Sequence, residues 1–448
     1  RRNQITIRDF QFKSGVKITT MKKRQIINYL FLSLLTIVMA SCAKDDGVEL
    51  NENGEVVHPE KGGQIVAGDP LLNDFVIAAK DETIYTVDAQ TGEETVIYSF
   101  PDLTDFVGPA DYNNGTIYVT SDDNSINALN VADRRFLWDR YMLEFDFGSM
   151  GATRPICIDG VCYASGGSGV VVAVDEVTGI LKWYYSTEPN GRLDYVLNNN
   201  QAPVVYGDKV YVFSEKSYYS DVPSYLHILD KETGRLIQKQ KLPYEPTGVP
   251  LFMENTMYLP AKNLYVIDLD TFNTLWMLEV NGVGTPFVSG DKLVVNAIPY
   301  GQSIGSVLYC LDKNNQSILW EVETGANSLW EPLIVGNVVF SNYDKGTSFP
   351  GATNAKPFAL DLRNGEELWN NQDVSVDFSP VYANGMLFTH GHDILRNNND
   401  QNSVGLLAMD ANTGEVLWLN PLFRFGSHIA PLVVADNGVF GPSSYRSK

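Results

Sequence analysis

Two cysteines of the sequence are spaced so that they could bond to each other. Cys157 and Cys162 flank the residues Ile-Asp-Gly-Val. If Asp159-Gly160 forms a two-residue hairpin turn, the cysteines lie opposite each other on neighbouring strands. A cross-strand disulfide then fits an exported protein, and two packed thiols fit the sequence equally well. Either arrangement is structural.

Two histidines form the strongest candidate metal pair. His390 and His392 are separated by one glycine in a polar segment. A protein metal site needs three or four ligands, and no third ligand is evident near them. We therefore expect a solvated pair and no metal site.

A segment near the N-terminus has the layout of a secretory signal. A basic run starts at Met21, and an apolar run of residues 26–40 leads to Ser41 and Cys42. Small residues before a cysteine resemble a bacterial lipobox, which makes Cys42 the expected lipidation site. We expect an over-extended start at residues 1–20, a lipoprotein signal peptide at 21–41, and a lipidated, flexible polar tether at 42–70.

The residues after Cys42 bear on the location. Acyl chains on a cysteine hold a protein on a membrane without a spanning helix. We therefore expect lipid anchoring to the outer membrane, at its periplasmic face or at the cell surface. Lys44-Asp45-Asp46 resembles the signal that sends some Gram-negative lipoproteins to the surface, and it favours that face.

The composition excludes one class of partner. The 448 residues include 33 Lys+Arg against 54 Asp+Glu, a formal net charge of −21. A nucleic-acid backbone needs a basic surface, so we expect no nucleic-acid partner. The chain also has 23 Tyr, 21 Phe and 37 Gly, a mixture that favours short strands and tight turns.

The region 71–448 is built from repeats. A clear copy has Ala173 and Asp175, then Thr178-Gly179, then Trp183. Equivalent Asp or Asn anchors recur every 38 to 55 residues, at positions 88, 130, 175, 230, 268, 312, 361 and 410. Six of the seven tryptophans lie eight residues after an anchor: Trp138, Trp183, Trp276, Trp320, Trp369 and Trp418. Repeats of this length with about four short strands each are typical of propeller blades.

The two ends of the repeat array complement each other. The first anchor, Asp88, has no preceding proline segment, and the last proline segment, from Pro431 to Phe440, has no tryptophan motif. Together they make one blade. We predict an all-β fold: an eight-bladed β-propeller of four-stranded antiparallel blades, closed by N- and C-terminal strands that share one blade.

The repeat motif, Ala-x-Asp-x-x-Thr-Gly-x-x-x-Trp, resembles the tryptophan docking motif of PQQ-type (quinoprotein) β-propellers. The resemblance implies that each tryptophan packs between neighbouring blades and that a glycine allows the turn before it. These glycines are Gly92, Gly179, Gly234, Gly365 and Gly414. Val96 and Gln238 stand where tryptophan is expected, which predicts two softer blade contacts.

The family includes quinone-dependent dehydrogenases, and the resemblance is to their blades. Those enzymes typically carry an adjacent-cysteine disulfide, a calcium ion and an aspartate base. This sequence has no adjacent cysteines and no evident calcium ligand set. We therefore expect no PQQ, no calcium, no catalytic residue and no enzymatic activity.

The connections between the second and third strands of the repeats vary in length and should emerge on one face. The long ones contain aromatic residues among Gly, Ser and Asn, a mixture that suits protein or sugar recognition. The candidate binding residues are Tyr218, Tyr219, Tyr225, Tyr300, Tyr343 and Phe349.

Three functions are compatible with this layout. It is similar to the BamB family of β-barrel assembly lipoproteins, which implies a scaffold that binds a protein partner in the outer membrane. The alternative is a surface-exposed binder of glycans or proteins that uses the aromatic loops. A PQQ-dependent dehydrogenase is the third and least favoured.

Overall fold

A computed structural model describes most of the region after residue 73. The chain divides into two compact units, Arg1–Val57 and His58–Lys448, and the described residues all lie in the second. They are 74–100, 107–121, 125–141, 154–166, 169–187, 195–197, 202–216, 224–303, 305–325, 329, 331–343, 355–393, 403–423, 432–435 and 438–440. No helix within these residues is long and apolar enough to span a membrane.

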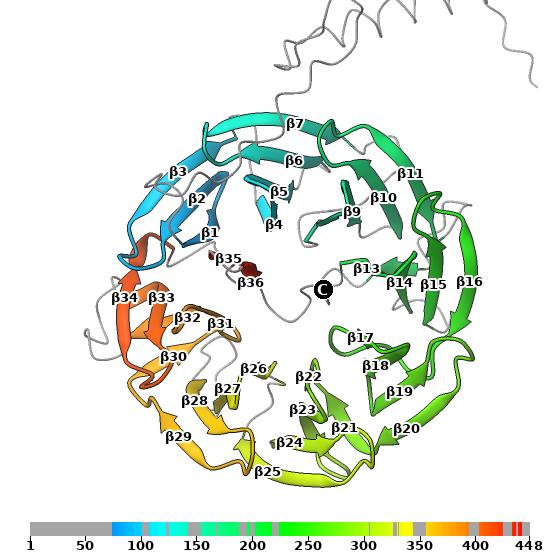
Figure 1. Cartoon of the computed structure of the whole chain (residues 1–448), viewed down its shortest axis with the longest axis vertical. Coiled ribbons are helices and arrows are strands. Elements are labelled where there is room, and N and C mark those ends of the chain that lie inside the picture. Colours follow the sequence, from blue (N-terminus) through cyan, green and yellow to red (C-terminus); the bar gives the residue numbers. More distant parts are fainter. Residues whose placement is uncertain are drawn as a thin grey trace, which may run out of the picture. The chain divides into compact units, whose positions relative to one another are not determined.

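The strands of the second unit form eight antiparallel blades around a central axis, as predicted (Figure 1). Blade 1 contains β1 (Phe75–Lys80), β2 (Thr83–Asp88), β3 (Glu94–Ser99), β35 (Leu432–Ala435) and β36 (Gly438–Phe440). Blade 2 contains β4 (Val107–Asn113), β5 (Thr116–Ser121), β6 (Ser125–Asn130) and β7 (Arg135–Tyr141). Blade 3 contains β8 (Ile156–Ile158), β9 (Val161–Ser165), β10 (Val170–Asp175) and β11 (Leu181–Ser186).

The next blades follow in chain order. Blade 4 contains β12 (Tyr195–Leu197), β13 (Val204–Tyr206), β14 (Lys209–Lys216), β15 (Tyr225–Asp230) and β16 (Leu236–Lys241). Blade 5 contains β17 (Leu251–Met253), β18 (Thr256–Pro260), β19 (Leu264–Asp268) and β20 (Thr274–Leu278). Blade 6 contains β21 (Val280–Val283), β22 (Phe287–Ser289), β23 (Lys292–Pro299), β24 (Ser306–Asp312) and β25 (Ile318–Gly325).

The last two blades return to the start of the ring. Blade 7 contains β26 (Leu333–Val335), β27 (Val338–Tyr343), β28 (Lys356–Asp361) and β29 (Glu367–Asn370). Blade 8 contains β30 (Val374–Val376), β31 (Val381–Ala383), β32 (Met386–Asp393), β33 (Val404–Asp410) and β34 (Val416–Asn420), followed by a 3-10 turn, η4 (Pro421–Phe423).

The ring closes in blade 1, which confirms the shared blade. Strand β1 pairs with β2 on one side and with β35 on the other, and Phe75 lies opposite Val434. The N-terminal segment supplies three strands and β35 supplies the fourth, while β36 adds a fifth at the inner edge. The edge of β1 that β2 leaves open is thus paired by β35.

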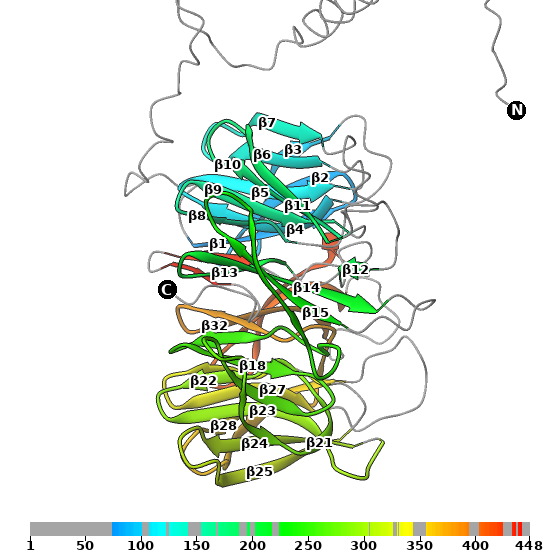
Figure 2. The same ribbon diagram turned by 90° about the vertical axis from the view of Figure 1, so that its right-hand side faces the viewer.

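Three alternate blades have an extra strand that the sequence did not predict. In blades 4, 6 and 8 the strand that pairs with the extra one is eight residues long; these strands are β14, β23 and β32. The C-terminal part of this strand pairs with β12, β21 or β30, and its N-terminal part pairs with β13, β22 or β31. Figure 2 shows β12 and β21 on the same side of the ring, so the additions raise one face.

The core consists of layers between blades. Eight hydrophobic clusters of described residues each join two neighbouring blades. Five of these contacts use an indole laid against a glycine of the next blade. A Cβ built on that glycine would lie only 2.4–2.9 Å from the ring, so no larger residue fits there. The pairs are Trp138–Gly179, Trp183–Gly234, Trp320–Gly365, Trp369–Gly414 and Trp418–Gly92.

Each of these five indoles is also hydrogen-bonded to the next blade. Its Nε1 donates to the carbonyl that follows the repeat anchor, as in Trp183 to Lys231 at 3.0 Å. The anchor itself shapes the turn: Asp175 Oδ1 accepts bonds from the Thr178 amide and hydroxyl at 2.9 and 2.8 Å. The motif therefore combines a capped turn, a bare backbone and an indole donor.

The other three contacts lack the glycine. Arg134, Phe272 and Gln316 occupy the equivalent positions, each with a left-handed φ between 51° and 69°. By position in the repeat, Val96 corresponds to the first, Gln238 to the second and Trp276 to Gln316, and Trp276 is only half-buried. The five indoles that dock fully therefore all meet a glycine, because a Cβ at the turn removes the space for the ring.

A matched pair of glycine substitutions tests this docking. Gly207 and Gly234 lie in the same blade with φ of 62° and 66°, but only Gly234 faces a tryptophan. Gly207→Ala should cost about 1–2 kcal/mol, the strain of a left-handed residue with a Cβ. Gly234→Ala should cost about 1–3 kcal/mol more, because its methyl group collides with Trp183.

The measurement is the free energy of unfolding from urea denaturation of the two purified variants. Equal losses of stability in both would show that the indole does not depend on the glycine.

Candidate functional site

Residues that precede the innermost strands link four consecutive blades at the centre of the ring. Thr285 lies before β22 and Glu331 before β26, and these strands lie near the axis (Figure 1). The Thr285 hydroxyl donates to Glu331 Oε1 at 2.9 Å and accepts from the Val249 amide at 3.0 Å. The Glu331 amide donates to Ser379 Oγ at 3.0 Å. These bonds tie blades 5 to 8 together.

A buried arginine faces this chain of bonds from the opposite blades. Arg154 lies just before β8 and is 6% exposed. Burial lowers the pKa of its guanidinium to about 10, and the negative charges of Asp111 and Glu331 oppose that shift. Asp111, in β4, also accepts the Cys157 amide at 2.7 Å. The two carboxylates offset part of the cost of burying this positive charge.

A second buried group resembles a nucleophile and its base. His227, in β15, has Nδ1 2.8 Å from the Tyr185 hydroxyl and Nε2 2.9 Å from Ser214 Oγ. A serine bonded to a histidine is the arrangement that activates a hydroxyl in acyl transfer. Here both side chains are fully buried, so no substrate reaches them.

The electrostatics of His227 agree with a structural role. Burial, and then the positive charge of Lys239, lowers the pKa of His227 to about 3. A neutral ring that resists protonation is a poor proton acceptor at pH 7. Sequence reasoning missed this group because Tyr185, Ser214 and His227 come from two different repeats.

The histidine pair lies in a strand, so the prediction of a solvated loop was wrong. His390 and His392 belong to β32, and His390 is buried. His390 Nε2 donates to the Phe423 carbonyl at 2.8 Å, and its Nδ1 lies 2.6 Å from Asp377 Oδ2. These bonds connect β32 to η4, and a role in holding this turn accounts for the residue.

The predicted binding tyrosines have different surroundings. Tyr300 lies in the turn after β23 and is 69% exposed. Tyr225 begins β15, and Tyr343 is buried at the end of β27, where its hydroxyl donates to Glu367 at 3.1 Å. For these two the predicted loop position was wrong, because the strands run further than the apolar pattern indicated. The other three predicted aromatic residues lie outside the described residues: Tyr218, Tyr219 and Phe349.

The remaining predicted site residues are the cysteines and the acidic run that follows Cys42. Cys157 and Cys162 are bonded across the β8–β9 hairpin, with Asp159 and Gly160 in its turn at positive φ. Cys42 and Lys44-Asp45-Asp46 lie outside the described residues.

The described residues contain no group of three or more His, Cys, Asp or Glu that could hold a metal ion. The bonded cysteines are five positions apart, which differs from the adjacent pair of the quinone enzymes. These residues do not fit the calcium and quinone arrangement, and the expectation of a cofactor-free chain stays a prediction.

The pH dependence of stability should report the buried histidine. The pKa of His227 is about 3 in the fold and about 6.5 in the unfolded chain, so below pH 6.5 only the unfolded chain gains the proton. The stabilising effect is complete above pH 6.5 and is lost as the pH falls towards 3. Between pH 6.5 and 5 the free energy of unfolding should fall by up to about 1.4 kcal/mol per pH unit from this group.

The measurement is urea denaturation at several pH values for the wild type and His227→Gln. The variant is less stable but should show a flatter pH dependence in this range. Parallel curves for the two proteins would contradict the assignment.

Comparison with known proteins identifies relatives of the chain. Tetrathionate hydrolase of Acidithiobacillus ferrooxidans is 24% identical over 327 residues, covering 66% of this chain and 61% of that protein. Quinoprotein ethanol dehydrogenase of Pseudomonas putida is 26% identical over 283 residues, covering 58% of this chain and 38% of that protein. The chain therefore spans less than two thirds of the length of these curated relatives.

These relatives correct one prediction. Both relatives are enzymes by name, and their similarity to the chain contradicts the prediction that it has no enzymatic activity. The error arose because the absence of a quinone-type cysteine pair was taken to exclude other chemistry on the same blades.

A solved structure shows the shared fold, and a family model shows the family. The solved structure of BamB from Moraxella catarrhalis shares the fold, with a TM-score of 0.52 at 15% identity, covering 75% of this chain and 92% of that one. A family model described as outer membrane protein assembly factor BamB matches residues 40–276 and 261–429. The chain belongs to this BamB-type family of PQQ-like β-propellers.

Proposed function

We propose that the chain is an outer-membrane lipoprotein that binds a protein partner through the raised face of its propeller. The family model supports a role of the assembly-factor kind. The observation that carries the proposal is the extra strand in blades 4, 6 and 8, which lengthens the same face in three alternate blades. A face built outward on a rigid ring suits recognition of a large partner.

The turn after β23 presents the best-placed anchor on this face. Tyr300 is exposed at its tip, and the Asn281 side chain donates to the Gln302 carbonyl at 2.6 Å. Val280 of β21 lies opposite Pro299 of β23, so the extra strand braces the turn from the side. A turn braced in this way loses little backbone entropy when its tyrosine binds, which favours a strong contact.

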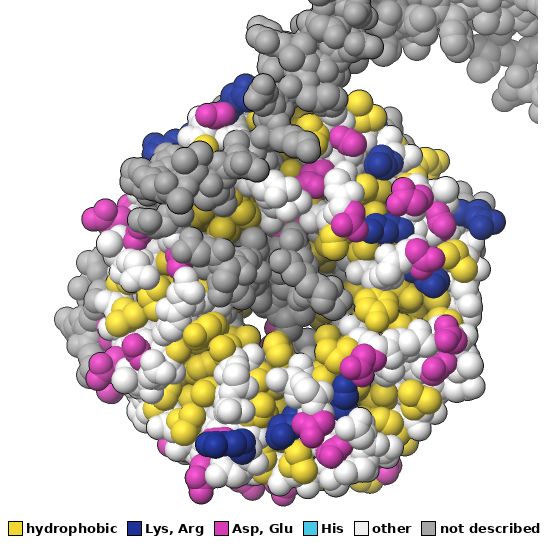
Figure 3. Space-filling view, viewed as in Figure 1, with side chains coloured by type: hydrophobic (Ala, Val, Ile, Leu, Met, Phe, Trp, Pro, Cys, Tyr) yellow, Lys and Arg dark blue, Asp and Glu magenta, His cyan; other side chains and the backbone are white. Residues whose placement is uncertain are grey.

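Figure 3 shows the face of the ring that lies opposite the raised face, with acidic and basic side chains scattered among apolar ones. The proposal concerns the other face, which the extra strands lengthen.

Partner capture tests the role of this face. The tagged full-length chain, crosslinked in its own outer membrane, should recover a β-barrel assembly protein. Tyr300→Ala should reduce that recovery about tenfold, the effect of removing an interface hot spot. Tyr184→Ala is the matched control, because Tyr184 is a 53% exposed tyrosine on the outer strand β11.

Equal recovery with both variants would remove Tyr300 from the interface. Recovery of nutrient-uptake barrels or surface glycan binders, with no assembly protein, would overturn the assembly role. It would favour the alternative, a surface-exposed binder of glycans or proteins.

Membrane attachment is the second part of the proposal. The chain should remain with the outer membrane in high salt and be released by detergent, because lipid on Cys42 inserts into the bilayer. Cys42→Ser should move it to the soluble fraction, and Ser41→Ala, which keeps a small residue before the cysteine, should not. Protease added to intact cells should leave a periplasmic scaffold uncut. A Cys42→Ser protein that stays in the membrane would contradict the lipid anchor.

A further inference from the structure

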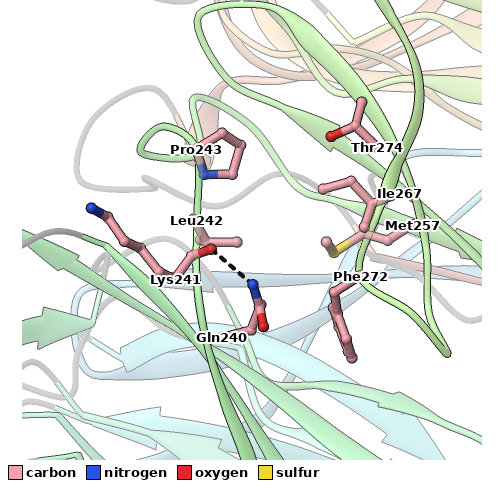
Figure 4. A pocket seen from close by; sticks show the side chains of 8 residues that line it. All are labelled: Gln240, Lys241, Leu242, Pro243, Met257, Ile267, Phe272 and Thr274. Atoms are coloured by element: carbon pink, nitrogen blue, oxygen red, sulfur yellow. Dashed lines mark hydrogen bonds between the residues drawn. The ribbon is translucent and has the colours of Figure 1, made fainter.

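A pocket of about 520 Å³ lies between blades 4 and 5, at one of the contacts without a docking tryptophan (Figure 4). Its apolar lining includes Leu242, Pro243, Met257, Ile267 and Phe272. Gln240, Lys241 and Thr274 supply the polar part of the lining. In Figure 4 the segment from Gln240 to Pro243 forms one wall, and the blade 5 side chains form the other.

The neighbouring contact shows what this space normally holds. Between blades 3 and 4, Trp183 packs with Val210 and Leu229 and lies against Gly234. By strand register, Val210 and Leu229 correspond to Met257 and Ile267, and Gly234 corresponds to Phe272. The pocket is therefore lined by the counterparts of the residues that surround an indole one blade earlier.

No side chain of blade 4 fills the space. Gln238 stands at the tryptophan position, and its side chain is exposed and bonded to Gln240 at 3.4 Å. The docked indoles donate to the carbonyl after the anchor, which in blade 5 belongs to Leu269. Within the described residues no donor is bonded to that carbonyl. The wall that receives an indole is present, and the indole is missing.

The contact between blades 1 and 2 shows that a missing tryptophan need not leave a pocket. Val96 stands at the tryptophan position there. Tyr98, Phe100 and Phe136 form an aromatic cluster at that contact, with ring centroids 5.0–6.4 Å apart. The contact between blades 4 and 5 has no aromatic cluster of this kind at the equivalent positions, and the pocket remains open there.

The surface around the pocket is apolar and carries positive charge. Leu236, Ile237, Tyr244, Leu275 and Met277 are each 40–57% exposed on the adjoining strands and loop. The lysines of this surface are Lys239, Lys241 and Lys262. Lys241 lines the pocket, and its ammonium group points away from the blade 5 wall, towards the rim (Figure 4). Lys239 and Lys262 lie over the rings of Tyr225 and Tyr244.

From these observations we propose that the pocket receives a tryptophan side chain from an acidic segment of a partner polypeptide. The apolar walls suit an indole, and the lysines of this surface suit carboxylates beside it. The Phe272 side chain prevents the pose of the five docked indoles, so the guest ring packs on Phe272. Trp276, whose counterpart in the next blade is Gln316 and not glycine, is an example of an indole that remains half-buried.

This inference rests on the proposed protein-binding function and adds a site outside the raised face. The probe is the peptide acetyl-Asp-Asp-Trp-Asp-Asp-amide, with a second peptide carrying Ala in place of Trp. The full-length chain in detergent carries ¹³C-methyl methionine, and NMR follows Met257, assigned through Met257→Leu. Met409, buried in blade 8, is the internal control.

The tryptophan peptide should move the Met257 methyl signal by its ring current and leave Met409 unchanged, and the alanine peptide should move neither. Lys241→Glu should weaken binding about fivefold by placing like charge at the rim. Lys182→Glu, at an exposed lysine of β11, should have no effect. Gln238→Trp combined with Phe272→Gly should fill the pocket from within and reduce binding more than tenfold.

The proposal is overturned if the two peptides act alike on Met257, or if both lysine variants weaken binding equally. Lys241→Glu changes only a surface charge, so it tests the site even if the double variant does not fold. Partner recovery in the crosslinking experiment separates the two proposals. If the tryptophan peptide does not bind and the Lys241→Glu variant recovers as much partner as the wild type, the pocket proposal is rejected. The proposed scaffold function is then retained.

Discussion

The structure depends on one contact, an indole laid on the bare backbone of the next blade. The ring of Trp183 covers Gly234, and its N–H bonds to the carbonyl of Lys231, so a single side chain supplies packing and direction at once. Five such contacts fix the angle between successive blades. Because a short four-stranded blade buries little surface by itself, its stability comes from its neighbours. Sites on the ring can therefore be placed on turns and strand ends without weakening the core.

The fold could be predicted from the sequence because its signals repeat. Asp175, Thr178, Gly179 and Trp183 each have a local physical role, and the same spacing recurs around the ring. The closing blade was also predictable, since the partial motif at Asp88 lacks what the end of the chain supplies. Periodicity of this kind reports local turn chemistry and interblade packing, which are the terms that determine a propeller.

The site residues were harder to predict, because they depend on contacts between repeats. The burial of His227 depends on Tyr185 from another blade, and the enclosure of Tyr343 depends on strands longer than their apolar runs. The sequence marked Gln238 as a departure from the motif, which predicted a softer contact. Whether such a departure leaves a pocket depends on the next blade, where Phe272 replaces glycine but does not fill the space. Enzymatic chemistry among relatives was likewise invisible in the repeat itself.

The pairing of β1 with β35 has a consequence for how the chain reaches this state. Phe75 must find Val434, so the first strand waits for a partner synthesised at the far end of the array. Interior blades are hairpin-rich and can form in order as each appears, but the last contact has a very high sequence separation and closes slowly. During that interval blade 1 presents an open strand edge, which is prone to aggregate. A folding helper that shields this edge would thus act on an early and transient species, before any ring exists.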